Sequence, residues 1–393
     1  MFGRRPVEAD VWGAAAGTRR PACSPHRNHQ GAVPPSHGMD LRCPACDRTF
    51  PDRWRCTCGS PLEFAERPRP ATETPDVDPR EGMWAFRSFL PVARHVSLGE
   101  GYTPLVDGPD PATAYKLEYV LPTGSFKDRG AATTLSRAVA VGADRVLEDS
   151  SGNAGAAIAA YAARAGLPAR IYVPADANPS KLAAIRRAGA DVVRVDGTRG
   201  DVAGACVDAV DAGEGWYASH AWNPAFLAGT ATMAHELAHQ RDWTVPDALV
   251  LPVGHGTLLL GAYRGFRALE AAGWTDRTPR LLAAQAAGHA PIVAALHGSH
   301  AAAGENDVAD GIRIDDPVRE TAILEAIEAT DGDAIALPSA AVRTESDRLH
   351  GEGFYVETTA AVAPAALRAY RDRGLVDADD DVVVPLTGTG LKE

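Results

Sequence analysis

The chain has 393 residues, of which 45% are hydrophobic and 23% are charged, so it can bury a large core and has the composition of an ordinary globular protein. The formal net charge of -12 argues against nucleic acid as the main partner. No apolar run approaches the roughly 20 residues that a membrane span needs, and we see no secretory leader. We therefore expect a cytoplasmic protein with neither nucleic-acid nor membrane partners.

The N-terminal part divides into three stretches of different composition. Residues 1–38 are rich in Pro, Gly, Arg and His without any period, so we expect disorder there. A cysteine-rich stretch over 39–64 follows, and then a linker over 65–95 that is rich in Pro, Arg and Asp. The cysteine spacing C-x2-C-x9-C-x-C is typical of a closed, structural zinc site. We predict a small zinc-ribbon-like module with four ligands: Cys43, Cys46, Cys56 and Cys58.

Most of the remaining chain alternates short apolar runs with amphipathic stretches. The segments RVLEDSS, ARIYVPA and DVVRVDG, between residues 145 and 197, read as strands separated by helices. ALVLP, RLLAAQ and DVVVPL continue this pattern between residues 248 and 386. Such alternation predicts an α/β fold whose parallel sheets are covered on both faces.

PTGSFKDRG, residues 122–130, places a lysine where a turn becomes a helix. Pro, Thr, Gly and Ser are turn and cap residue types, and AATTLSRAVAVGA behind them is helical in pattern. The positive end of the helix dipole favours the neutral amine of Lys127. A neutral lysine amine suits a nucleophile or the holder of a Schiff base.

Three glycine-bearing loops follow strands: SSGNAG at 150–155, PVGHGT at 252–257 and LTGTG at 386–390. In open α/β sheets ligands bind at the carboxyl ends of strands, so the three loops can line one crevice. PVGHGT runs directly into a helix, whose free N–H groups can hold a phosphate. Together with Lys127, the loops indicate a phosphorylated carbonyl cofactor.

Several motifs in order resemble the threonine synthases and their relatives among the fold-type-II (tryptophan synthase beta-like) pyridoxal-phosphate (PLP) enzymes. They are EGYTPL, YKLEYVLPTGSFKDRG, SSGNAG, PVGHG, EGFYVETTAA and TGTGLKE, and the likeness covers about residues 43–393. The resemblance implies two α/β domains that face each other across a PLP cleft. The large PLP-binding domain would comprise 96–130 and 223–393, with a small α/β domain over 131–222 inserted into it. Homodimers are usual in the family.

The resemblance also assigns roles in holding the cofactor. Lys127 would form the internal aldimine with PLP and would be the catalytic base, while Phe126 would pack against the ring. Asn153 would bind the phenolic oxygen, and Thr387 would meet the pyridine nitrogen. The phosphate would be held by Gly254, His255, Gly256 and Thr257.

For the substrate, the resemblance implies a small amino acid whose carboxylate is bound by Ser151, Gly152 and Ala154. Threonine synthases convert O-phosphohomoserine and water to L-threonine and phosphate, and many clamp the substrate phosphate with an arginine in an Asn-Pro-x-Arg stretch. Here WNPAFLAGT has Phe226 at that position. A phenyl ring offers no charge-assisted donor, which predicts weak use of O-phosphohomoserine. If position 226 faces the phosphate, Phe226→Arg should improve that use.

Other cations would then have to supply the charge, and the candidates Lys116, Lys181 and Arg313 are each expected to have a surface role instead. This leaves open a β-eliminating or β-replacing reaction, as in threonine or serine ammonia-lyases and cysteine or cysteate synthases.

Two hypotheses from other classes compete with a PLP enzyme. HELAH, residues 235–239, matches the H-E-x-x-H signature of zinc metalloproteases, with His235 and His239 as ligands and Glu236 as general base. No further histidine follows at the spacing of the extended signature, so two polar residues one turn apart are the simpler interpretation. A zinc-ribbon nucleic-acid adaptor fits the cysteines but neither the acidic charge nor the long α/β pattern.

Overall fold

A computed structural model describes residues 39–177 and 179–392 of the chain. The predicted disorder of residues 1–38 lies outside the described residues. The described part begins with a small antiparallel sheet of order β2-β1-β3, whose strands are β1 (Leu41–Arg42), β2 (Thr49–Phe50) and β3 (Glu63–Phe64). The segments that connect these strands carry the four clustered cysteines of the predicted ribbon-like module.

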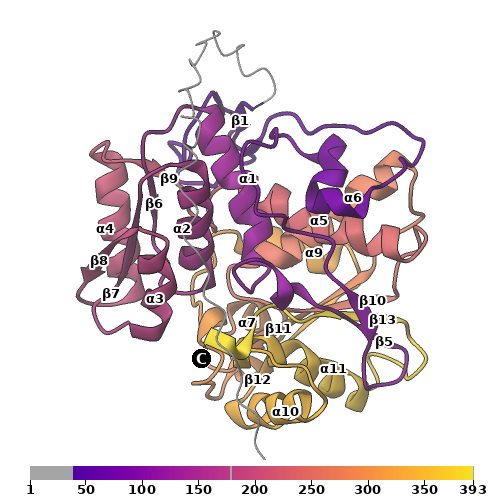
Figure 1. Cartoon of the computed structure of the whole chain (residues 1–393). Coiled ribbons are helices and arrows are strands. Elements are labelled where there is room, and N and C mark those ends of the chain that lie inside the picture. Colours follow the sequence, from indigo (N-terminus) through magenta and orange to yellow (C-terminus); the bar gives the residue numbers. More distant parts are fainter. Residues whose placement is uncertain (1–38, 178, 393) are drawn as a thin grey trace, which may run out of the picture. The chain divides into compact units, whose positions relative to one another are not determined.

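The larger of the two sheets built mainly from parallel strands has six strands in the order β12-β11-β10-β13-β5-β4 (Figure 1). Its strand pairs are parallel except β4–β5, which is antiparallel. Every residue of β10 and β13 is buried, which explains why these continuous apolar runs take the central positions. The strands are β4 (Leu105–Asp107), β5 (Thr113–Lys116), β10 (Ala248–Pro252), β11 (Arg280–Ala286), β12 (Asp333–Leu337) and β13 (Val382–Pro385).

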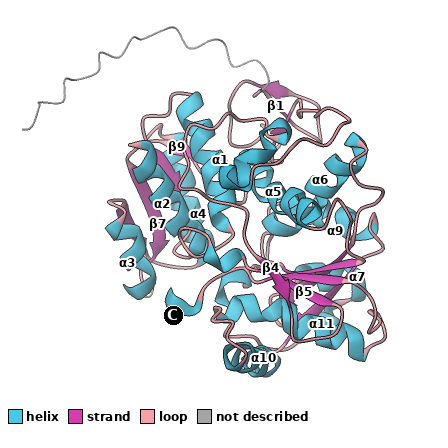
Figure 2. Cartoon of the chain, turned by 45° about the vertical axis from the view of Figure 1, so that its right-hand side comes forward, coloured by secondary structure: helices cyan, strands magenta, loops and turns pink. Residues whose placement is uncertain are grey.

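Helices cover both faces of this large sheet, as its two-sided burial requires (Figure 2). Leu249 and Leu251 of β10 pack into a core with α5, α6 and α9, whereas Val250 packs on the other face with α10 and α11. The helices of this part are α5 (Pro224–Gln240), α6 (Thr257–Ala272), α7 (Pro291–His297), α8 (Ser299–Ala302), α9 (Glu320–Glu328), α10 (Ser339–Gly351) and α11 (Val362–Asp372). Among the described residues, no helix has both the length and the apolar composition of a membrane span.

The smaller sheet has four parallel strands in the order β8-β7-β6-β9. Helices α1 to α3 pack on one face, while α4 packs on the other and places Cys206 in the core. The elements are α1 (Lys127–Ala140), β6 (Val146–Glu148), α2 (Asn153–Ala165), β7 (Ala169–Pro174), α3 (Pro179–Arg187), β8 (Asp191–Val195), α4 (Arg199–Asp211) and β9 (Trp216–Tyr217).

The strands of the two sheets fall in separate stretches of the chain, while the predicted domain limits stay a prediction. All four strands of the small sheet lie within 131–222, and the six strands of the large sheet lie within 96–130 and 223–393. The stretch predicted as a plain linker differs, because it contains the 3₁₀ helix η1 (Pro79–Phe89), whose Met83, Trp84, Phe86 and Phe89 are buried. Shorter 3₁₀ turns are η2 (Glu118–Val120), η3 (Asp310–Ile312), η4 (Thr358–Ala361) and η5 (Gly390–Lys392).

Candidate active site

The lysine turn is fastened to the loop that follows β13. The backbone N–H of Phe126 donates to the carbonyl of Thr387 at 3.1 Å, and the N–H of Thr389 donates to the carbonyl of Gly124 at 2.9 Å. Lys127 is the first residue of α1, as the sequence predicts. The turn and the loop therefore hold Lys127 and Thr387 beside each other, although 260 positions separate them in the sequence.

The amine of Lys127 lies 3.8 Å from the centre of the Phe126 ring. Burial lowers its pKa from 10.5 to about 8; Glu357 opposes this shift and Arg199 adds to it. The direction agrees with the sequence-based expectation, but its main cause is burial rather than the helix dipole. Roughly a tenth of the amine is therefore neutral at pH 7 and about half near pH 8, far more than for an ordinary lysine, and the neutral form is the one that acts as a nucleophile or base.

Lys127 lines a cavity of about 580 Å³ between the carboxyl ends of the strands of both sheets. All residues predicted to bind the cofactor or the substrate carboxylate line this same cavity: Phe126, Lys127, Ser151, Gly152, Asn153, Ala154, Gly254, His255, Gly256, Thr257 and Thr387. The structure thus brings together segments that span more than half of the chain, while their individual roles stay predictions.

The loop at 254–257 is shaped by its glycines and leads into α6. Gly256 has a φ of +70°, and a Cβ there would lie 2.4 Å from Cδ1 of Ile323, so a larger residue would strain the loop. The Nδ1 of His255 is buried and has no hydrogen-bond partner within the described part of the chain. This orphaned polar atom and the N-terminus of α6 are the kind of groups that bind a phosphate.

Behind this loop lies a carboxyl–imidazole pair that sequence reasoning missed. His220 contacts the ring of His255, with ring centroids 5.4 Å apart, and its Nδ1 lies 2.7 Å from Oε1 of the buried Glu148. Burial raises the pKa of Glu148 to about 8 and lowers the pKa of His220 to about 3. Both groups are therefore neutral at pH 7, and the pair supports the loop without adding charge.

Asn153 is held by two further residues without a predicted role. Its Nδ2 donates to both carboxylate oxygens of Glu357 at 2.9 and 3.0 Å, and its Oδ1 accepts from Nζ of Lys392 at 3.0 Å. Both partners belong to motifs used for the resemblance, EGFYVETTAA and TGTGLKE. The motif itself was the available signal, since neither residue type stands out alone.

A family model described as "Pyridoxal-phosphate dependent enzyme" matches residues 96–388 of the chain. A protein named threonine synthase from Methanosarcina acetivorans is 36% identical over 82% of this chain and 81% of its own length. Another from Methanocaldococcus jannaschii is 32% identical, covering 90% of this chain and 93% of its own. The chain is a pyridoxal-phosphate-dependent enzyme of the threonine synthase family.

Solved structures agree on the fold of this enzyme. Maize serine racemase is similar with a TM-score of 0.61 at 20% identity, over 74% of this chain and 88% of that one. The processed form of threonine deaminase isoform 2 from Solanum lycopersicum has a TM-score of 0.59 at 20% identity, over 70% of this chain and 74% of that one. The expected α/β fold of a fold-type-II PLP enzyme is thereby confirmed.

The cavity meets the chemical requirements of PLP. It offers a half-buried, partly neutral amine at Lys127, an aromatic ring at Phe126, and an unpartnered imidazole nitrogen in a glycine loop at a helix start. The hydroxyl-bearing Thr387 lines the cavity as well. These residues can bind an aldehyde, a flat ring, a phosphate and a ring nitrogen, which are the four recognisable parts of this cofactor.

The residues considered for a phosphate clamp are placed differently from the expectation. Phe226 is fully buried and is not part of the cavity lining; a Cβ on Gly130 would lie 2.4 Å from its ring. The surface role expected for Lys116 is wrong, because Lys116 is completely buried. Arg313 is exposed and outside the lining, and the side chain of Lys181 lies outside the described residues. Two arginines that the sequence analysis passed over, Arg187 and Arg199, do line the cavity.

HELAH is not a metal site in this enzyme. Glu236 accepts from Arg129 at 2.6 Å and from Lys116 at 3.1 Å, and these two cations outweigh burial and lower the pKa of Glu236 to about 2. His235 stacks on Phe89, with ring centroids 4.3 Å apart, while Nδ1 of His239 contacts the hydroxyl of Tyr102. Both histidines therefore serve packing, and the metalloprotease hypothesis is wrong.

The four clustered cysteines converge as their spacing predicts. The Sγ atoms of Cys43, Cys46, Cys56 and Cys58 all lie within 4.8 Å of one another, and they form the group with metal-binding geometry among the described residues. Cys43 and Cys58 are 3.6 Å apart, and Cys46 and Cys56 are 3.4 Å apart. Such separations match the edges of a tetrahedron of thiolates around one ion.

Proposed function

We propose that this enzyme converts O-phosphohomoserine and water to L-threonine and phosphate. The observation that carries the proposal is the similarity to proteins named threonine synthase over four fifths or more of both chains. The geometry supports it, because a lysine with a lowered pKa, a glycine loop suited to a phosphate and room for a substrate share one cavity. Phe226 no longer counts against a phosphorylated substrate, since position 226 does not line that cavity.

We expect different cavity residues to have different roles in such a reaction. When bound, PLP withdraws electrons from the substrate and so allows a group to leave from Cβ or Cγ. The neutral amine of Lys127 would accept the proton from Cα. Ser151 and the N-terminus of α2 would bind the substrate carboxylate, and Glu357 would orient Asn153 through the two contacts described above.

Lys127→Ala tests the proposal most directly. We expect threonine formation to fall by at least about 10²-fold, since general base catalysis by a positioned group contributes about 10²–10⁴-fold. The bound cofactor should also lose its lysine-dependent absorption, which borohydride bleaches in the wild type. Lys392→Ala is the comparison variant: it removes a second amine of the same cavity and a contact to Asn153 but leaves the base in place, so it should lower turnover less and keep the lysine-dependent absorption. Wild-type turnover by Lys127→Ala would overturn the proposal.

The β-eliminating and β-replacing reactions on serine, threonine or a cysteine precursor remain the alternative. They are favoured by Ala154 and Gly155, where threonine synthases commonly carry Thr and Ser. Initial rates of the PLP-loaded wild-type enzyme on O-phosphohomoserine, L-threonine and L-serine distinguish the proposed reaction from this alternative. Pyruvate or 2-oxobutanoate as the main product, instead of L-threonine, would favour the alternative.

We also infer that the cysteine cluster binds one structural zinc. Four thiolates fill all positions of a tetrahedral ion, so this metal would have no catalytic role. We expect about one zinc per chain by elemental analysis, lost in Cys43→Ser and retained in Cys206→Ser, whose sulfur belongs to the core of the small sheet. Zinc that survives Cys43→Ser together with Cys46→Ser would contradict the assignment.

A further inference from the structure

The cavity wall formed by the small sheet's helices is basic. Besides Lys127 and Lys392, the charged residues of the lining are Arg187, Arg199, Asp310 and Glu357. The two acids come from segments after β11, whereas the two arginines come from α3 and α4. Arg199 lies close enough to lower the pKa values of Lys127, His220 and His255, as a nearby cation must.

The position of Arg199 is fixed by the cap of α4. The N–H of Asp201 donates to the hydroxyl of Thr198 at 3.3 Å, and the N–H of Thr198 donates to Oδ2 of Asp201 at 2.6 Å. This capping box occupies Asp201 and leaves Arg199 as the first residue of the helix. A cation there is disfavoured by the helix dipole, but an anion would be attracted by the dipole and the guanidinium together.

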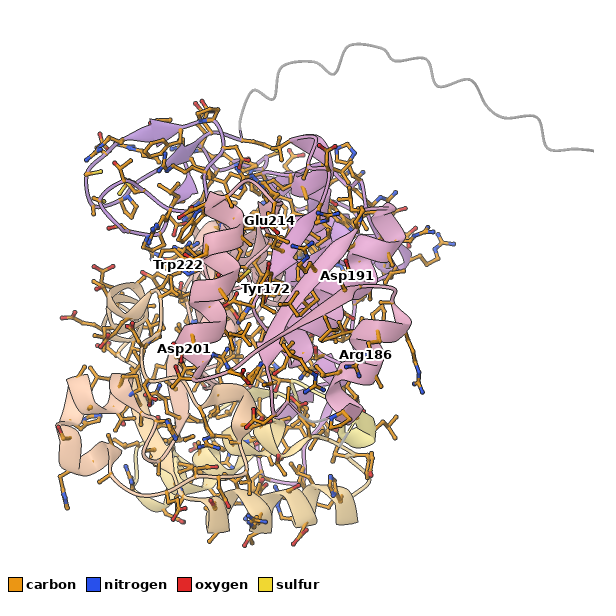
Figure 3. All side chains as sticks on the ribbon, turned by 90° about the vertical axis from the view of Figure 1, so that its left-hand side faces the viewer. Tyr172, Arg186, Asp191, Asp201, Glu214 and Trp222 are labelled. Atoms are coloured by element: carbon orange, nitrogen blue, oxygen red, sulfur yellow. The ribbon has the colours of Figure 1, made fainter. Side chains whose placement is uncertain are left out.

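Arg187 extends the same wall from α3. Ala183 and Arg187, four residues apart, lie on one helix face and both line the cavity, and the small alanine leaves room for a ligand. Arg186, the neighbouring residue, is outside the lining. In Figure 3, Arg186 of α3 and Asp201 of α4 lie toward the same end of the small sheet. Neither Arg187 nor Arg199 has an ion-pair partner among the residues described.

We propose that Arg199, assisted by Arg187, binds the phosphate monoester of the substrate and so replaces the clamp that is missing at Phe226. The proposal rests on the proposed function and names the residues that select its phosphorylated substrate. A planar guanidinium can donate two parallel hydrogen bonds to a phosphate dianion. When the bond between carbon and the phosphate oxygen breaks, its electron pair stays on that oxygen, and the same donors stabilise the charge that develops there.

The site differs from the one expected for the phosphate of PLP. The glycine loop at 254–257 belongs to the end of β10, whereas Arg187 and Arg199 belong to helices of the small sheet. Two phosphates bound together need separate donors, since dianions repel each other at short range. The two sets of donors on different elements of one cavity provide this separation.

Arg199→Gln is the decisive variant, and Arg186→Gln is the matched control, since each removes one exposed guanidinium from a helix of the small sheet. For Arg199→Gln we expect the KM for O-phosphohomoserine and the inhibition constant of inorganic phosphate to rise about 10- to 100-fold. A change of this size is expected because the variant loses charge-assisted hydrogen bonds to the phosphate. The dissociation constants of L-threonine and of PLP, followed by cofactor absorption, should change less than about twofold. Arg187→Gln should act in the same direction more weakly, and Arg186→Gln should change none of these values.

Each other result has a defined meaning. If Arg199→Gln weakens the binding of PLP or L-threonine as much as that of inorganic phosphate, Arg199 binds the cofactor or the substrate carboxylate and the proposal is wrong. It is equally wrong if the inhibition constant of inorganic phosphate does not change. If the loaded wild type forms no threonine, the proposed function fails instead; phosphate competition against the substrate that the enzyme does use still tests Arg199.

Discussion

The enzyme contains two groups of charged side chains that use similar residues in opposite ways. Where α1 packs on α5, Lys116 and Arg129 face Glu118 and Glu236 at 2.6 to 3.1 Å, and none of the four side chains is exposed. In the cavity, by contrast, Arg187 and Arg199 are exposed and have no ion-pair partner within the described residues. The first group neutralises itself and connects helices, whereas the second keeps its charge available for a ligand.

Removing one cation from the first group, whose buried charges are all paired with one another (the closed group), should cost the most stability. Arg129 donates to both Glu118 and Glu236, so Arg129→Ala leaves two buried carboxylates without their main partner. We expect a loss of about 3–5 kcal/mol in the free energy of unfolding, measured by urea denaturation. A loss below about 1 kcal/mol would show that water reaches the group and that it is not closed.

Adding a cation at a fully buried position should lower the free energy of unfolding by nearly as much. Phe226→Arg would bury a guanidinium between Gly130 and His220, where the nearest carboxyl group, that of Glu148 bonded to His220, has its pKa raised to about 8 and is largely neutral at pH 7. We expect at least about 3 kcal/mol of destabilisation and no improvement in the KM for O-phosphohomoserine. Phe226→Leu is the control for lost packing alone. A stable Phe226→Arg variant that uses the substrate better would restore the clamp expected from the sequence.

The open side of the comparison predicts a pH dependence. Because the pKa of Lys127 is lowered to about 8, the neutral amine that reacts with the cofactor aldehyde is half formed near pH 8. The rate of PLP uptake by the apoprotein should rise with pH and level off above about pH 8. The unfolded chain binds this proton more tightly, so the same group adds to stability as pH rises from about 8 to 10.5. An uptake rate that still rises toward pH 10.5 would contradict the lowered pKa.

An exposed ion pair gives the smallest expected effect. Arg94 and Glu81 are 2.9 Å apart, but about half of the Arg94 side chain is exposed. Arg94→Ala should therefore change the free energy of unfolding by less than about 1 kcal/mol, in the same urea experiment that measures Arg129→Ala. A loss of stability comparable to that of Arg129→Ala would show that buried, paired charges and exposed charges do not differ in their contribution to stability.

Sequence reasoning succeeded where a local pattern has a local cause. Lys127 at a helix start and the glycine loops after apolar strands could be predicted because turn chemistry and strand burial act over a few residues. Partners far apart in the sequence could not be found this way. Glu357 and Lys392 reach Asn153 across more than 200 positions, and Lys116 looks like any surface lysine until Glu236 is placed beside it. Arg187 and Arg199 lie on ordinary helices, and only the packing shows that both face the cavity.

The place of β13 in the large sheet has a consequence for how the enzyme folds. β13 lies between β10 and β5, and its residue Val384 pairs with Tyr115 from nearly 270 positions earlier. Closing so long a loop carries a high entropic cost, and folding slows as contacts become less local. The turn around Lys127 cannot bond to Thr387 until this last central strand arrives. Uptake of cofactor in a refolding experiment would then follow the slowest phase and would time the completion of the sheet.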